Sequence, residues 1–190
     1  MSLIARYDRL IAHIQDRLAP IYMPTATRLV FAGTLFVYFW NSAQTKVGEG
    51  LFSPDFGAYA QILPRVIEAV GYDPSQIGTL GRAVVLFGTY TEFLLPVLIV
   101  AGLFTRFAAL GMIGFILVQS YVDIVGHGVD AATIGSWFDR VSSSAILDQR
   151  AFWVLALLSL VSRGAGPLSL DALLTRWRGA PVASAAQTPT

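Results

Sequence analysis

The fold is decided by residues 83–122, which read AVVLFGTYTEFLLPVLIVAGLFTRFAALGMIGFILVQSYV. A membrane-spanning helix needs about 20 predominantly apolar residues, and Arg106 divides this stretch into two apolar segments that approach that length. Residues 83–105 hold one charged side chain, Glu92, and residues 107–122 hold none. The stretch therefore predicts a helical hairpin that crosses a membrane twice.

Two further apolar segments predict two more spans. Residues 29–45 carry no charge and lie between Arg28 and Lys46. Residues 151–162 are too short alone, and they reach a span with residues 145–147 and 165–168 if Asp148 and Arg150 extend toward the membrane surface. Short connections favour an all-α fold, an integral membrane four-helix bundle.

The composition agrees with a membrane protein. Of 190 residues, 55% are hydrophobic and 13% are charged, whereas soluble chains carry about 25% charged residues. A net charge of +1 provides no field that would attract nucleic acid. The chain has no cysteine, which excludes disulfides, thiolate metal sites and thiol exchange by its own residues.

Residues 1–24 predict an amphipathic helix ahead of the spans. The apolar side chains recur at helical spacing, and the basic side chains lie off that stripe. The stripe comprises Leu3, Ile4, Tyr7, Leu10, Ile11, Ile14 and Leu18. Such a helix lies in a membrane interface or packs on a soluble partner, and we expect Pro20 and Pro24 to end it. We expect residues 25–178 to form the four-span domain and residues 179–190 to be a disordered tail.

The basic residues predict the orientation. With both termini cytoplasmic, eight lie inside and five outside, as the positive-inside rule requires. The inner set is Arg6, Arg9, Arg17, Arg28, Arg106, Arg163, Arg176 and Arg178, and the outer set is Lys46, Arg65, Arg82, Arg140 and Arg150. The loops 47–82 and 126–150 then face outward, the first with a short helix over 56–70.

Polar residues in three spans predict a pocket that opens outward. Glu92 lies near the membrane midplane, four residues before Pro96, which removes a backbone hydrogen bond there. Gln119, Asp123 and His127 follow one helix face of the third span, and Asn41 lies at similar depth in the first. These groups either hydrogen-bond helices to one another or form a ligand pocket, a quinone contact or a proton relay. Their spacing matches no metal-ligand motif.

Three patterns resemble the DoxX family of small four-span membrane proteins. The first is Asn41-Ser42-Ala43-Gln44-Thr45-Lys46, and the second is Glu92 followed by residues 102–110, GLFTRFAAL. The third is the segment 164–171, GAGPLSLD, which is similar to the signature that closes these proteins. In mechanical terms, Arg106 faces lipid phosphates, Gly164, Gly166 and Pro167 stop the fourth helix, and Ser169 or Asp171 caps a helix over 171–178.

The resemblance implies two functions of different kinds. Some DoxX-like proteins are subunits of thiosulfate:quinone oxidoreductases, and others associate with oxidoreductase complexes. We therefore expect a bacterial inner (plasma) membrane subunit that supports a quinone-linked oxidoreductase, with a quinone held near Glu92, Asn41, Gln119, Asp123 and His127. The alternative is a structural or assembly subunit of a larger membrane complex, without a site of its own. The residues do not decide whether the chain is itself an enzyme.

Overall fold

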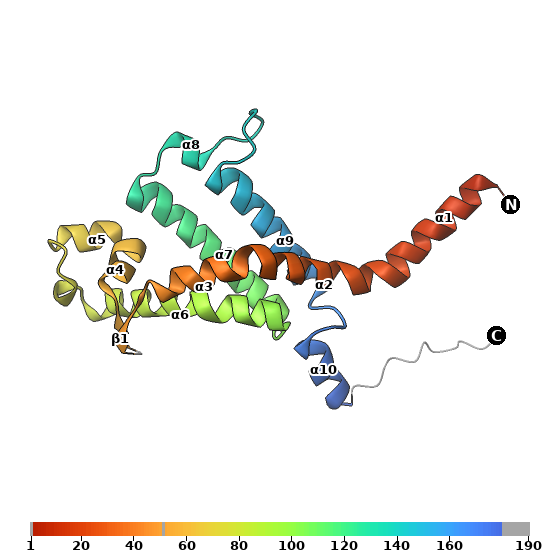
Figure 1. The fold of residues 1–190 in the computed structure, drawn as a ribbon, viewed down its shortest axis with the longest axis horizontal. Helices are drawn as coiled ribbons and strands as arrows, with labels where there is room; N and C mark the ends of the chain where they lie inside the picture. The colour runs from red at the N-terminus through yellow and green to blue at the C-terminus, as the bar shows by residue number, and fades with distance from the viewer. Residues whose placement is uncertain (1, 51, 180–190) are drawn as a thin grey trace.

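The computed structural model describes residues 2–50 and 52–179 of the chain, most of them in helices (Figure 1). The predicted tail therefore lies, except for residue 179, outside the described residues. The chain begins with one helical run from Leu3 to Gln44. It contains α1 (Leu3–His13), α2 (Ala19–Phe31) and α3 (Val37–Gln44), joined by π-helical turns over Ile14–Leu18 and Ala32–Phe36.

The prediction that Pro20 and Pro24 end the first helix is wrong. Pro20 lies in the first turn of α2, where the N–H that proline lacks costs little, and a π-helical turn precedes it. Pro24 lies inside α2 and is buried, so packing offsets the hydrogen bond that it removes. α1 consequently joins α2 without a break in the helical run, bends away from the direction of α2 and points away from the body of the molecule (Figure 1).

Three helices are long and apolar enough to cross a membrane. They cover Thr79–Ala101, Thr105–His127 and Ala145–Arg163. The first is α6, the second joins α7 (Thr105–Tyr121) to a π-helical turn over Val122–His127, and the third joins a π-helical turn over Ala145–Gln149 to α9 (Arg150–Arg163). The segment 29–45, the first predicted span, is helical but less apolar and is not among these three.

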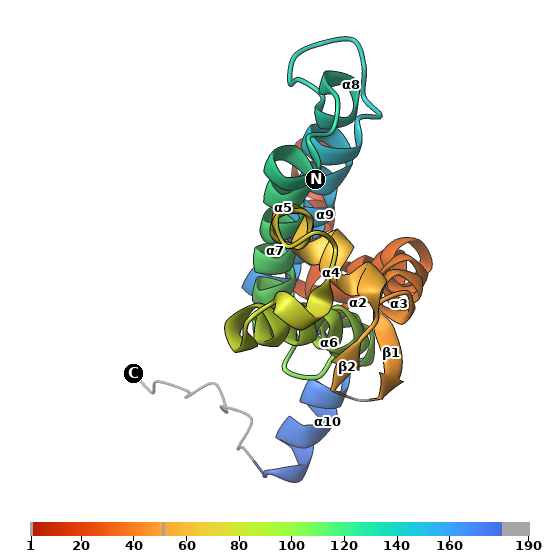
Figure 2. The same cartoon turned by 90° about the vertical axis from the view of Figure 1, so that its left-hand side faces the viewer.

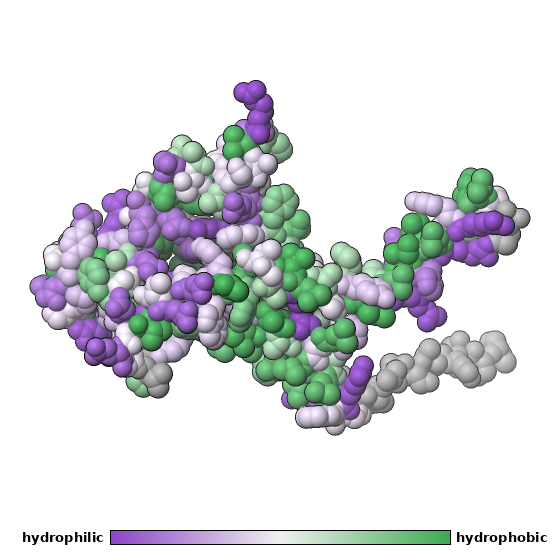
Figure 3. All heavy atoms as spheres, viewed as in Figure 1, coloured by the Kyte–Doolittle hydropathy of each residue, from purple (hydrophilic) through white to green (hydrophobic). Residues whose placement is uncertain are grey.

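One hydrophobic core takes side chains from the first helical run and from α6, α7 and α9. Its buried members are Phe31, Leu35, Phe39, Ile99, Ala108, Ala109, Met112, Ile116, Leu157 and Leu160. α7 packs against α6 and α9, α3 packs on α6, and α2 packs on α9 (Figure 2). Large apolar side chains such as Phe87, Phe107 and Phe152 point outward, and Figure 3 shows hydrophobic residues covering the middle of the body.

Small elements cover the end of the molecule where α3 stops. A two-stranded antiparallel sheet pairs β1 (Val47–Gly50) with β2 (Ser53–Pro54). The helix predicted over 56–70 is two helices, α4 (Phe56–Ile62) and α5 (Pro64–Ala69), because Leu63 leaves the helical conformation ahead of Pro64. A 3-10 turn over Pro74–Gln76 leads into α6. The short α8 (Ala131–Ile134) lies between α7 and α9 in the chain.

At the opposite end, Arg28 joins three parts of the chain. Its guanidinium donates to the carbonyls of Ile99 (3.0 Å) and Val100 (2.6 Å) at the end of α6. It also donates to the carbonyls of Ala165 (3.1 Å) and Leu168 (2.6 Å) in the segment after α9. The Ile99 carbonyl also accepts from the Gly102 N–H (3.1 Å), and the other three carbonyls lie at a helix end or in a loop, where the usual intrahelical donor is absent.

The segment 164–171 closes the same end. Gly164, with φ of 80°, ends α9, and Ser169 Oγ accepts from the Ala172 N–H (3.1 Å) to cap α10 (Leu170–Trp177). Asp171 instead caps α7, because its carboxylate accepts from the N–H groups of Phe104 (2.7 Å) and Thr105 (3.0 Å). Of the two predicted caps for the last helix, Ser169 therefore holds that place.

Gly102 and Arg106 complete this junction. Gly102 ends α6 with φ of 68°, and a Cβ there would lie 2.6 Å from the Ser169 Cβ and 2.7 Å from the Arg28 Cζ. Only glycine fits a turn that is both left-handed and this close to its neighbours. Arg106 donates to the Val161 carbonyl (2.9 Å) in the last turn of α9, and its predicted contact with lipid phosphates stays a prediction.

Candidate functional site

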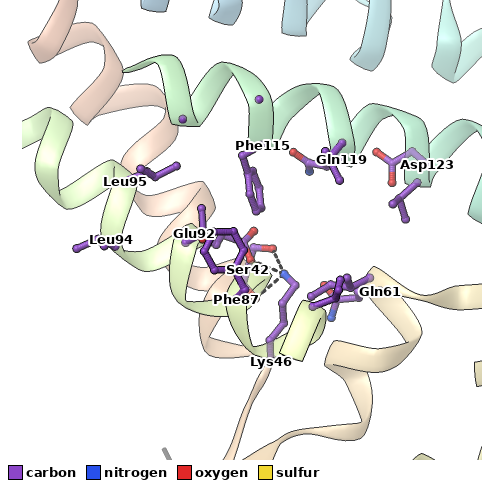
Figure 4. Close-up of a pocket in the computed structure, with 18 of the residues that line it drawn as sticks. Ser42, Lys46, Gln61, Phe87, Glu92, Leu94, Leu95, Phe115, Gln119 and Asp123 are labelled. Atoms are coloured by element: carbon purple, nitrogen blue, oxygen red, sulfur yellow. Dashed lines mark hydrogen bonds and ion pairs between the residues drawn. The ribbon is translucent and has the colours of Figure 1, made fainter. Parts of the chain in front are cut away.

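A cavity of about 740 Å³ lies between α6 and α7, with the end of α3 behind it (Figure 4). Apolar side chains line its inner part, and polar and charged side chains line the part near α4. The apolar set includes Leu94, Leu95, Gly111, Gly114, Phe115 and Val118, and the largely exposed Phe87 lies beside Ser42 and Lys46 (Figure 4). The polar set includes Tyr38, Ser42, Lys46, Gln61, Thr91, Glu92, Gln119, Asp123, His127 and Arg150.

Glycines on α7 leave room for the apolar part of this pocket. A Cβ on Gly111 would lie 3.2 Å from Leu95 Cδ2, which is a tight contact. A Cβ on Gly114 would meet no atom within 4 Å, so the space beside it belongs to the cavity. Larger residues at these two positions would therefore narrow the cavity.

Glu92 forms a buried ion pair with Lys46. The Lys46 Nζ lies 2.7 Å from Glu92 Oε2, and the two side chains are 6% and 2% exposed. The ammonium also donates to the carbonyl (3.1 Å) and the hydroxyl (2.7 Å) of Ser42, one turn back along the first helical run. Lys46 follows directly on the end of α3, and this position turns its side chain back along the helix toward α6 (Figure 4).

Asp123 belongs to a second ion pair at the polar end. Its Oδ2 lies 2.5 Å from Arg150 Nη2, and Arg150 Nη1 donates to Ser120 Oγ (2.9 Å). Gln119, one turn before Asp123, donates through Nε2 to the hydroxyl oxygen of Tyr38 (3.1 Å). α7 is thereby tied to α9 and to the first helical run at the depth of the pocket.

Two buried polar atoms beside the pocket have no hydrogen-bond partner among the described residues: Gln119 Oε1 and Arg150 Nε. Buried polar atoms are nearly always hydrogen-bonded, so each such exception calls for a partner. One of these atoms is an acceptor and the other is a donor. A group that both donates and accepts a hydrogen bond, such as a hydroxyl, would satisfy both atoms.

His127 and the α4–α5 segment close the outer end. The His127 Nε2 lies 3.2 Å from the Gln61 carbonyl, and Arg65 Nε donates to the Val125 carbonyl (2.8 Å). A Cβ on Gly126 would lie 2.8 Å from Pro64 Cγ, so the end of α7 and the start of α5 approach closely. The short helices of the outer loop thus cover the polar end of the cavity.

The structure brings four of the five predicted ligand residues to one cavity. Glu92, Gln119, Asp123 and His127 line it, whereas Asn41 is exposed and does not. Asn41 lies one residue before Ser42, which does line the cavity. Asn41 is therefore at the predicted level along the first helical run, but its side chain lies on a helix face that is turned away from the cavity.

The sequence analysis did not predict the role that two residues, Lys46 and Arg150, have in the pocket. Lys46 is predicted as a marker of topology, and Arg150 as a side chain that extends toward the membrane surface. Each is instead the partner of a carboxylate in the pocket. The sequence did contain a signal for these pairs. A carboxylate within a membrane-spanning segment needs a cation nearby, and Lys46 and Arg150 lie at the ends of the predicted spans.

These features define a helical, multi-pass membrane protein with an amphipathic cavity between its spans. The model of the DoxX family matches residues 23–123, just over half of the 190 residues, and the chain belongs to this family. The match includes residues 41–46 and 102–110 and ends before the 164–171 segment. The comparison with curated proteins found no match, and neither did the comparison with solved structures.

Proposed function

We propose that this chain is a membrane subunit that holds a quinone in the pocket between α6 and α7 and so supports a quinone-linked oxidoreductase. The observation that carries the proposal is the division of the cavity into an apolar inner part and a polar outer part. A cavity of about 740 Å³ has the size of a small-molecule site, and a quinone has the same two-part character. When bound, the quinone supplies the capacity to accept electrons from a partner enzyme.

The residues present fit such a ligand. At the polar end, the unpartnered Arg150 Nε would donate to an oxygen of the quinone head group, and Gln119 Oε1 would accept from the hydroxyl of the reduced quinol. The apolar tail would follow Leu94, Leu95 and Gly114 on α6 and α7. The outward-facing apolar side chains of these helices would place the mouth of the pocket in lipid, from which a quinone would enter.

The proposal includes a topology. The first helical run would cross the membrane as a fourth span, since Phe31, Leu35 and Phe39 share the core of the other three. Both termini would be cytoplasmic, in the inner (plasma) membrane of a bacterium. α1 would lie in the membrane interface with its apolar stripe toward lipid and its arginines toward phosphates.

The test is to fill the cavity from α7. Gly114→Leu places a side chain in the open volume beside Gly114, so quinone that copurifies with the chain should fall from about one per chain to a small fraction. The control is Gly33→Leu, because Gly33 also has no atom within 4 Å of a Cβ but lies outside the pocket. Quinone should be quantified by solvent extraction and chromatography after purification in mild detergent.

The alternative is an assembly subunit, and exposed apolar groups on other elements favour it. Leu3, Ile4 and Phe138 are 85%, 72% and 104% exposed, on α1 and on the loop before α9. If the wild-type chain purifies in a large complex without quinone, and Gly114→Leu leaves that complex unchanged, the quinone proposal is wrong and the assembly role stands.

A further inference from the structure

Each charged residue that lines the pocket is paired with another lining residue. Within the described part of the chain, these are Lys46 with Glu92 and Arg150 with Asp123, at 2.7 Å and 2.5 Å. His127, the remaining titratable group near the outer end, contacts the Gln61 carbonyl. The pocket thus holds two positive and two negative charges that cancel pairwise.

This cancellation leaves no counter-ion for a charged ligand. An anionic head group would have to separate Lys46 from Glu92 and leave the carboxylate buried and unpaired, and a cationic head group would leave Lys46 unpaired. Removing one partner of a buried ion pair is strongly unfavourable, because the other charge stays in a poorly solvated place. An uncharged head group can bind without separating Lys46 from Glu92.

Resting on the proposed function, we propose that the Lys46–Glu92 ion pair restricts the pocket to amphiphiles with an uncharged head group. The pair is a specificity determinant that excludes fatty acids, phospholipids and other charged amphiphiles of the surrounding membrane. Gln119 Oε1, which lacks a partner among the described residues, agrees with the exclusion of anions, since an amide oxygen needs a hydrogen-bond donor and a carboxylate supplies none. A hydroxyl group, as in an alcohol or a quinol, can both accept from Arg150 Nε and donate to Gln119 Oε1, whereas a ketone or quinone oxygen can only accept.

The experiment compares head groups on a common twelve-carbon chain. The purified full-length chain in nanodiscs would be titrated with dodecan-1-ol or dodecanoate and the bound amphiphile counted by native mass spectrometry. For the wild type we expect dodecan-1-ol to bind at least about tenfold more tightly than dodecanoate. Glu92→Gln removes the negative charge and leaves the ammonium unpaired, so dodecanoate should gain at least about tenfold over dodecan-1-ol.

The matched control is the double variant Lys46→Met with Glu92→Gln, which removes both charges and should again favour dodecan-1-ol. If Glu92→Gln does not give a monodisperse protein, Lys46→Met replaces it, and dodecylammonium is then the probe whose binding should rise. Equal binding of dodecanoate and dodecan-1-ol to the wild type overturns the inference, and so does an unchanged preference in a folded single variant.

The same titration separates this inference from the proposed function. A wild-type chain that binds dodecan-1-ol and dodecanoate equally has a ligand pocket without charge selection, so only the inference fails. A wild-type chain that binds neither amphiphile, nor the neutral probe decylubiquinone, has no ligand pocket, and both fail together.

Discussion

Lys46 and Glu92 show how a carboxylate is kept at the depth of a membrane-spanning helix. Glu92 lies within the 23 residues of α6, and its side chain is 2% exposed. A lone ionised carboxylate there would lose its hydration without compensation, whereas the Lys46 ammonium 2.7 Å away compensates its charge, and that ammonium in turn donates to the two Ser42 oxygens. Changing one member of the pair therefore alters both stability and binding, and the double variant is the informative comparison.

At the residue scale, Asp171 offers a test away from the pocket. Asp171→Ala removes the acceptor for the N–H groups of Phe104 and Thr105, and losing such a cap costs about 1–3 kcal/mol. We expect a lower free energy of unfolding in mixed detergent micelles, with ligand binding unchanged once the protein is folded. Asp171→Asn keeps one acceptor oxygen and should fall between the two. An unchanged stability for Asp171→Ala would show that the cap is replaced by water.

Residue periodicity could predict which side chains share a helix face, but not which faces meet. Glu92, Gln119 and Asp123 follow from polar residues in apolar segments, and the structure places them around one cavity. The pairing of Lys46 with Glu92 could not be predicted in this way, because it depends on how α3 packs against α6. The same holds for Asp171, whose partners lie 66 and 67 residues earlier in the chain.

At the element scale, the first helical run combines a packed part and a free part. α2 and α3 contribute buried residues to the core, whereas α1 buries none. From the prolines alone, an end of the helix is predicted near residue 20. The sequence could not show that a π-helical turn precedes Pro20 and that Pro20 lies in the first turn of α2, where a proline is tolerated. Where local preferences and packing disagree, packing decides, as the buried Pro24 shows.

α1 should therefore be separable from the rest of the chain. Deletion of residues 2–13 removes no buried side chain, so the free energy of unfolding should stay within about 0.5 kcal/mol of the wild type, with quinone retained. If proteins that copurify with the chain are lost at the same time, α1 is their docking element. The matched pair Leu10→Ser and Asp8→Ser then distinguishes the apolar stripe from the polar face. A chain that unfolds on this deletion would contradict the separation of α1 from the core.

At the scale of the whole molecule, the two ends of the helical body differ in kind. One end gathers Arg28, Gly102 and the 164–171 segment into a hydrogen-bonded junction. The other carries the β1–β2 sheet, α4, α5 and α8 (Figure 1), and α4 and α5 cover the polar end of the pocket. The proposed orientation assigns the junction to the cytoplasm and the covered polar end of the pocket to the outside.

Single cysteines can test this orientation directly, because the natural chain has none. Phe138→Cys, at a fully exposed position before α9, should react with a membrane-impermeant maleimide in spheroplasts. Trp177→Cys, 76% exposed in α10, should react only after the membrane is permeabilised. The wild-type chain serves as the unlabelled control. The opposite pattern would invert the topology, and labelling of both residues from outside would contradict two cytoplasmic ends.

The hydrogen bonds of Arg28 cannot all form at the same stage of protein synthesis. Arg28 is synthesised with the first helical run, yet two of its acceptor carbonyls belong to residues 137 and 140 positions later. Until the ribosome has added them, the guanidinium has only part of its final set of partners. The bonds to these two carbonyls can thus form only after residue 168 has been added, so a chain truncated after α9 would leave Arg28 with only its acceptors Ile99 and Val100, and membrane proteases and chaperones could recognise the incomplete junction.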